Sequence, residues 1–184
     1  MRVFGGWVGS RIIIVLAEGV KPEAGRDKAP APVDRHGSLK QNDPAMPKQH
    51  WLLKTEPSEF SFDDLLSRGR ETWDGITNPL ALKHLRAARA GDLAIIYHTG
   101  TERRAVGLAR VASDPYPDPH AGTASRSVVD LEPLKRLAAP VTLEAIKKDA
   151  RFAGIDLLRI PRLSVVPLSS RHWEILMKMS GTSL

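Results

Sequence analysis

Apolar positions from residue 50 onward fall into short runs that alternate between strand and helix patterns. Strands are indicated where apolar and β-branched residues cluster between turn residues, and helices where a capping residue precedes apolar positions at helical spacing. Ser61 with Asp64 forms a capping box that Gly69 closes, and Asn78 before Pro79 makes an N-cap and first-turn pair. The predicted strands cover residues 51–54, 93–98, 105–111, 128–131, 157–158 and 163–166; the predicted helices cover 61–69, 78–91 and 142–148, with a last helix that Ser169 or Ser170 caps.

This succession of short strands and brief helices is typical of an α+β domain, here a compact mixed β-barrel or strongly bent sheet with short flanking helices. The polar phrase at residues 99–102, between two β-rich runs, predicts a hairpin. The apolar positions of the periodic segments predict the core. These positions are Leu53, Leu65, Leu85, Ile95, Val106, Leu108, Val129, Leu163, Val165, Trp173 and Leu176.

Composition divides the chain near residue 47. Residues 19–49 are rich in Pro, Lys, Asp and Gly, and such a segment buries too little apolar surface to offset its ordering entropy. We therefore predict a disordered N-terminal extension at 1–46, a folded domain at 47–178 and a short tail at 179–184. Met46 precedes the first structured phrase, so residues 1–45 are either a mistaken upstream extension or a real flexible tail.

Net charge and cysteine content narrow the classes of partner. The formal charge of +6 and the pI near 9.8 favour a polyanion, because Lys and Arg displace counterions from phosphates. The excess is +3 in residues 1–50 and +3 in the remainder, so the charge does not mark one basic arm. The absence of Cys excludes a disulfide framework, a thiol nucleophile and a thiolate metal site.

No segment of the sequence has the length or composition of a membrane span. The longest apolar run, residues 12–17, is far shorter than the ~20 residues that a bilayer requires. Arg11 interrupts what would otherwise be the apolar part of a signal peptide. We therefore predict a cytoplasmic protein without membrane contact.

The usual signatures of catalysis are missing from the sequence. It contains no Gly-rich phosphate loop, no His-Glu-x-x-His, no Gly-x-Ser-x-Gly elbow and no group of His at metal-ligand spacing. We expect no cofactor and no metal, and a binding module is favoured over an enzyme.

Five short phrases hold polar and aromatic residues at predicted strand ends. They are HWLLKTEP at 50–57, WDGITN at 73–78, GD at 91–92 followed by YHT at 97–99, YPDP at 116–119 and RLSV at 162–165. In this order they resemble the EVE family of the PUA-like superfamily, in which a strand runs into Lys-Ser-Glu-Pro and later phrases read Trp-Asp-Gly-Val-Arg-Asn and Tyr-His-Ser. Thr55 stands where the family has Ser and keeps the hydroxyl group.

The resemblance implies a PUA-like fold, which binds RNA or DNA, and EVE members are regarded as readers of modified bases such as methylated or hydroxymethylated cytosine. Two departures bear on the ligand. Thr77 stands where many relatives have Arg, and Pro79-Leu80 stand where they have Tyr-Gln. Contacts that those side chains make in the family are lost or altered here.

The residues themselves suggest how a base would be held. A base removed from its stack needs aromatic or apolar faces and hydrogen-bonding partners for its edge. Trp73 and Tyr97 can supply faces, or can pack in the core as most aromatic residues do. His98 follows Tyr97 along a predicted strand and faces the opposite side, so one of the two faces the core.

Strand alternation sorts the polar candidates. Lys54 and Glu56 share one face of the first strand and Thr55 lies opposite, while Arg162 and Ser164 share a face of the strand at 163–166. Glu56 can accept a hydrogen bond from an exocyclic amine, or can pair with Lys54 or Arg162. Arg162 can equally lie in a surface ion pair.

Three functions therefore stay open. The leading hypothesis is a monomeric module that binds one modified base of DNA or RNA; a small RNA-modification or nucleotide-processing enzyme using Glu56, Asp74 or His98 as acid-base groups is the alternative. A protein-interaction domain that has lost its pocket is the third.

Asn78 acts as an N-cap, and the helix N-terminus that it begins also suits a phosphate or a base carbonyl. The predicted ligand-binding residues are Lys54, Thr55, Glu56, Trp73, Asn78, Tyr97, His98, Arg162 and Ser164.

Overall fold

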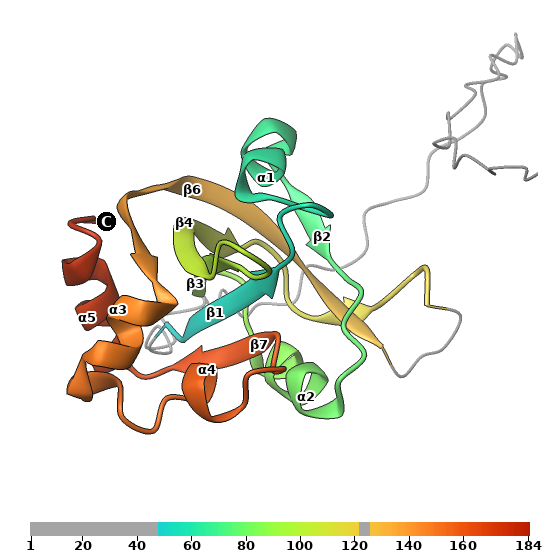
Figure 1. The fold of residues 1–184 in the computed structure, drawn as a ribbon. Coiled ribbons are helices and arrows are strands. Elements are labelled where there is room, and N and C mark those ends of the chain that lie inside the picture. The colour runs from blue at the N-terminus through green and yellow to red at the C-terminus, as the bar shows by residue number, and fades with distance from the viewer. Residues whose placement is uncertain (1–47, 122–125) are drawn as a thin grey trace, which may run out of the picture. The chain divides into compact units, whose positions relative to one another are not determined.

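In the computed structural model, a curled sheet of seven strands organises the described residues, which are 48–121 and 126–184 (Figure 1). Six strands follow one another in the order β2, β6, β4, β3, β1, β7, and β5 pairs with β6 beside this path. The β1–β3 pair is parallel, and the other described pairs are antiparallel. The strands are β1 (His50–Thr55), β2 (Glu71–Trp73), β3 (Leu93–His98), β4 (Arg104–Val111), β5 (Tyr116–Pro117), β6 (Ser127–Thr142) and β7 (Val165–Leu168). The predicted disorder of residues 1–46 lies outside the described residues.

The long strand β6 makes the sheet curl. It runs from the end of the sheet near α2 (Pro79–Ala87) to the end near α3 (Leu143–Lys148) and α5 (Ser170–Met179), as Figure 1 shows. Its pairing with β4 shifts register twice, which lets the strand bend. The sequence predicted only residues 128–131 of this strand, because exposed charged residues interrupt the apolar pattern of its second half.

Local capping signals place most helices. The capping box of Ser61 and Asp64 opens α1 (Phe62–Arg68), and Gly69 ends it in a left-handed conformation, as predicted. Helix α2 begins after Asn78 but ends at Ala87, earlier than predicted, because Ala88 is already extended. The remaining helical elements are η1 (Ala150–Phe152) and α4 (Asp156–Arg159).

Two strand predictions near the C-terminus are corrected. Residues 157–158 lie in the short helix α4, because an apolar pair alone does not distinguish a strand from a helical turn. The strand predicted at 163–166 is β7 at Val165–Leu168, shifted by two residues.

The concave side of the sheet and the helices around it enclose one core. Every predicted core residue is buried except Val106, which is half-buried and packs against the core. Gly107 is required by close packing, since a Cβ atom there would lie 2.2 Å from the ring of Phe62. The buried carboxylate of Asp92 accepts hydrogen bonds from Trp51 Nε1 at 2.9 Å and from the backbone of Gln49, which ties β1 to the start of β3.

Candidate functional site

A hollow of about 570 Å³ opens where the carboxyl end of β1 meets the segments before and after β2. We call it the polar hollow. Its lining combines aromatic and apolar side chains, carboxylates, cationic side chains, and side chains with hydroxyl or amide groups. Its lining residues are Lys54, Thr55, Glu56, Glu59, Phe60, Arg68, Glu71, Thr72, Trp73, Asp74, Gly75, Ile76, Thr77, Asn78, Arg162 and Ser164.

Trp73 forms part of the wall of the polar hollow and belongs to the core at the same time. It ends β2, opposite Val129 of β6, and only 6% of it is exposed. Its indole Nε1 is buried and has no hydrogen-bond partner among the described residues. Leaving a buried donor unpaired costs about 1 to 3 kcal/mol. The two sequence alternatives for Trp73, core packing and a ligand face, are therefore compatible.

Phe60 and Arg68 extend the wall beside Trp73. The rings of Phe60 and Trp73 meet edge to face, with centroids 6.2 Å apart. The Arg68 guanidinium lies over the Phe60 ring at 5.2 Å and pairs with Glu71 at 2.7 Å. Sequence reasoning missed Phe60, although its place directly before the Ser61 cap is the usual one for a hydrophobic residue that packs against the first turn of a helix.

Glu56 presents its carboxylate at the end of β1. Thr99 Oγ1 donates a hydrogen bond of 2.8 Å to Glu56 Oε2, and Gly100 lies so close that a Cβ atom there would meet the carboxylate. In the described part of the chain Glu56 forms no ion pair with Lys54 or Arg162. The ion pair that the sequence allowed is therefore not formed. The Thr99 hydroxyl group holds the Glu56 carboxylate, which can still accept a hydrogen bond from an exocyclic amine.

Lys54 and Thr55 have partners within the fold. Lys54 Nζ donates to the Pro161 carbonyl at 2.9 Å, and burial lowers the pKa of this ammonium group. The Thr55 hydroxyl donates to the Phe60 carbonyl at 2.7 Å and so fixes the turn after β1. The backbone N–H of Lys54 donates to the Ser164 carbonyl at 2.9 Å, which brings Ser164 and Arg162 to the same hollow.

Asn78 is the N-cap that the sequence predicts. Its Oδ1 accepts from the backbone of Leu80 at 2.9 Å and of Ala81 at 3.1 Å. These bonds engage the oxygen and leave the Nδ2 donor for the hollow. Of the departures from the family pattern, Thr77 lines the polar hollow, whereas Pro79 and Leu80 are not among its lining residues.

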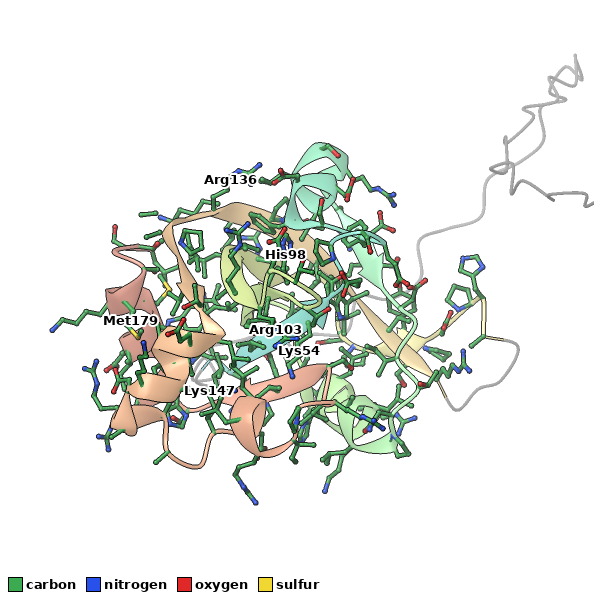
Figure 2. The ribbon with its side chains drawn as sticks, viewed as in Figure 1. Lys54, His98, Arg103, Arg136, Lys147 and Met179 are labelled. Atoms are coloured by element: carbon green, nitrogen blue, oxygen red, sulfur yellow. The ribbon has the colours of Figure 1, made fainter. Side chains whose placement is uncertain are left out.

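Tyr97 and His98 do not join the other seven candidates. Tyr97 lines a different hollow, and His98 is 6% exposed. The His98 Nε2 accepts from the backbone N–H of Phe62 at 3.0 Å, so its Nδ1 carries the proton and donates to Glu102 at 2.8 Å. Figure 2 shows His98 apart from Lys54, towards α1. The structure thus does not bring Tyr97 and His98 to the polar hollow, because β3 is buried along its whole length and sends its last two side chains elsewhere.

Residues 48–121 and 126–184 hold neither a candidate metal site nor a candidate membrane span. They contain no group of three or more His, Asp or Glu that could hold a metal ion. They also contain no helix long and apolar enough to cross a bilayer.

Comparison with known proteins gives one consistent family. The EVE domain family matches residues 49–179. The chain is similar to thymocyte nuclear protein 1 of Mus musculus, with 27% identity over 167 residues, which cover 72% of this chain and 74% of that protein. It is similar to a protein of Rhodopseudomonas palustris solved by NMR, with 38% identity and a TM-score of 0.69, covering 72% of this chain and 93% of the other. It is also similar to the human THYN1 protein in complex with 5-methylcytosine containing DNA, with 23% identity and a TM-score of 0.67, covering 74% of this chain and 100% of the other.

These comparisons confirm the predicted family and fold and correct the predicted localisation. The predicted α+β, PUA-like fold is confirmed by the shared curled mixed sheet with its few short helices. The prediction of a cytoplasmic protein is wrong on this comparison, because the curated relatives are named as nuclear proteins. The absence of cysteine and of a long apolar run does not separate nucleus from cytosol, since both are reducing and neither requires a signal peptide.

Proposed function

The chain belongs to the EVE domain family, and from this membership and the geometry of the polar hollow we propose that it binds one base of a nucleic acid, 5-methylcytosine. The human THYN1 protein, which shares the fold, is described in complex with 5-methylcytosine containing DNA. We further propose that residues 47–178 act as one monomeric module, and that the base is accepted from DNA or from RNA.

The observation that carries the proposal is the unpaired, buried indole N–H of Trp73 in the wall of a hollow that also holds a carboxylate. The pairing edge of cytosine has an exocyclic amine that donates and two atoms that accept. Glu56 can accept from the amine, while Trp73 Nε1 and Asn78 Nδ2 can donate to the acceptors. A base therefore satisfies groups that the protein leaves unsatisfied.

The charge of the polar hollow favours a neutral ligand over a phosphate. Four carboxylates, from Glu56, Glu59, Glu71 and Asp74, line it together with the three cations Lys54, Arg68 and Arg162. A phosphate group would meet like charge on several sides, whereas an uncharged base would not. The wall also includes Phe60 and Ile76, whose apolar surfaces suit the 5-methyl group.

We infer that the module binds the base without changing it. The enzyme alternative uses Glu56, Asp74 or His98 as acid-base groups, and Glu56 and Asp74 both line the polar hollow. Both ring nitrogens of His98 are engaged within the fold, and His98 does not line the polar hollow. His98 is thereby withdrawn from the acid-base groups of the enzyme alternative, and the relative described in complex with 5-methylcytosine containing DNA supports a reader.

The test is binding of the full chain to short single-stranded oligonucleotides that differ at one position, which is cytosine, 5-methylcytosine or adenine, in DNA and in RNA. We expect the tightest binding to 5-methylcytosine. Trp73→Phe keeps an aromatic face but removes the N–H, and should weaken this binding by about 1 to 3 kcal/mol. Trp73→Ala is less useful, because truncating so buried a Trp costs about 3 to 5 kcal/mol of stability.

Glu56→Gln tests the carboxylate, and Glu174→Gln on α5 is its charge-matched control outside the hollow. Glu56→Gln should lose affinity for both cytosines, and Glu174→Gln should not. Mass spectrometry of the recovered oligonucleotide should show an unchanged mass. Equal affinity for every base by the folded parent and by Trp73→Phe would contradict the proposal, and a changed mass would favour the enzyme.

A further inference from the structure

A second hollow, of about 420 Å³, adjoins the polar hollow and differs from it in charge. We call it the cationic hollow. Lys54, Arg103 and Lys147 line it, Tyr97 and Thr99 add hydroxyl groups, and no acidic residue is among its lining residues. Its remaining walls are Gly100, Leu143, Leu157, Leu158 and Pro161. Lys54 lines both hollows, and Figure 2 shows it on the same side of the molecule as Arg103 and Lys147.

The three cations have no carboxylate partner in the part of the chain that the structure describes. Glu102 and Glu144 lie at a shallower hollow beside Arg103 and Lys147. Both carboxylates have other partners: Glu102 binds His98 and Arg104, and Glu144 binds Lys148 at 2.6 Å. Glu56 also approaches this hollow, since its carboxylate accepts from Thr99 and lies beside Gly100, but it is not among the lining residues and forms no ion pair with Lys54, Arg103 or Lys147 in the described part of the chain.

Arg103 holds a backbone conformation that arginine rarely adopts. Its φ of 43° makes it the one non-glycine residue with a positive φ among residues 48–121 and 126–184. Such strain persists when the surrounding structure imposes it and is often found at functional sites. Here the Arg103 Nε also donates to the Gly100 carbonyl at 2.9 Å, which keeps the guanidinium beside the cationic hollow.

Tyr97 adds a neutral donor to the same hollow. Its hydroxyl group makes no hydrogen bond within the described residues, and only 3% of the residue is exposed. Burial raises the pKa of Tyr97 to about 12, against the opposing effect of Arg103. The hydroxyl group therefore keeps its proton at neutral pH and can donate it to an anion.

We propose that the cationic hollow binds a phosphate group of the nucleic-acid backbone, the one next to the base held in the polar hollow. This inference rests on the proposed function. Lys54 lines both hollows and can therefore contact either the base or the phosphate group. The division of charge supports the assignment, since carboxylates line the hollow for the neutral base, and cations without a carboxylate partner, together with the Tyr97 hydroxyl group, line the hollow for the anion.

The first test compares two neighbouring lysines of α3. Lys147 lines the cationic hollow, whereas Lys148 points to Glu144, so Lys147→Ala and Lys148→Ala remove the same charge from the same helix. Binding of the full chain to the 5-methylcytosine oligonucleotide is measured over a range of salt concentrations. Each lost phosphate contact should lower the slope of log affinity against log salt by about 0.7 for a single strand. We expect this change for Lys147→Ala and not for Lys148→Ala.

Arg103→Gly separates a binding role from a structural one. Glycine accepts a positive φ without strain, so a residue that served only the turn would gain stability and change nothing else. We expect a thermal midpoint equal to or above that of the parent, together with a lower salt slope. An unchanged slope in both Arg103→Gly and Lys147→Ala overturns the proposal.

A neutral methylphosphonate in place of the phosphate beside the modified base identifies the contact. It should weaken binding to the parent by about tenfold or more and have much less effect on Lys147→Ala. Inorganic phosphate is the second probe, followed through the amide resonance of Arg103. If it binds there equally well with and without the oligonucleotide, the hollow serves free phosphate and the backbone assignment is wrong.

The outcomes for the two proposals can be told apart. Loss of base preference with a Lys147-dependent salt slope would refute the proposed function and keep a phosphate site. Retained preference for 5-methylcytosine with equal slopes in Lys147→Ala and Lys148→Ala would refute only the phosphate site.

Discussion

Gly100→Ala tests the position of the Glu56 carboxylate with a single methyl group. Gly100 has a φ of +60°, and a Cβ atom built there lies 2.5 Å from Glu56 Oε1 and 2.7 Å from Oε2. An ordinary contact begins at 3.4 Å, so the carboxylate must withdraw by about 0.9 Å, the difference between 3.4 and 2.5 Å. This movement stretches the 2.8 Å hydrogen bond that Thr99 donates to Glu56.

Two costs add in this variant. Alanine in a left-handed conformation costs about 1 to 2 kcal/mol, and the loss of a partly exposed hydrogen bond to a carboxylate adds about 1 kcal/mol. Gly154→Ala is the matched control, because Gly154 has a φ of +84° and nothing within 4 Å of the added methyl group. The control should bear the first cost alone, so Gly100→Ala should melt about 3 to 5 °C below it.

Binding distinguishes the two variants more sharply than melting does. Gly154→Ala should bind the 5-methylcytosine oligonucleotide as the parent does, and Gly100→Ala should bind about tenfold more weakly, since one hydrogen bond of 1.4 kcal/mol is worth about that factor. Calorimetry and fluorescence titration measure the two quantities. Equal melting temperatures for both variants, with parental affinity in Gly100→Ala, would show that the Glu56 carboxylate is not held where the structure has it or does not contact the base.

Two further predictions concern stability. Burial lowers the pKa of His50, which stacks on Trp173 at 4.4 Å, although Asp92 and Glu174 oppose the effect. The unfolded chain then takes up a proton more readily than the folded one, so stability should be constant above pH 6.5 and fall below it; His50→Phe should reduce that fall in urea titrations at pH 7 and 5.5. Removal of residues 1–46 should leave the thermal midpoint unchanged, because their composition predicts little buried surface, and a drop of several degrees would contradict this.

Local signals explain how much of the fold the sequence could predict. The capping box at Ser61 and the Asn78-Pro79 pair are properties of a few adjacent residues, and both helices begin where those residues lie. The second half of β6 could not be found in this way. Its exposed residues, including Leu134 and Arg136, form a strand because β4 lies beside them, and that pairing is a property of the tertiary structure.

The candidate site, like the fold, could be predicted only as far as local sequence signals reach. Seven of the nine predicted residues line the polar hollow, since they lie at or beside the ends of β1 and β2, at the start of α2 or just before β7. Tyr97 and His98 lie elsewhere, because alternation does not assign faces in a strand buried on both sides, and because the β3–β4 register shifts between Ile96 and Tyr97. Tyr97 lines a second hollow, the cationic hollow, which the sequence did not indicate.

The net charge of the chain also needs the structure before it informs function. An excess of +6 attracts any polyanion and cannot say where the polyanion binds. In the fold, four carboxylates gather at the polar hollow, and three cations without carboxylate partners among the described residues gather at the cationic hollow next to it. A nucleotide complements this arrangement, because its uncharged base suits the polar hollow and its anionic phosphate suits the cationic hollow. Since affinity from the phosphate varies with salt and recognition of the base varies much less, the two hollows should contribute separable parts of one binding constant.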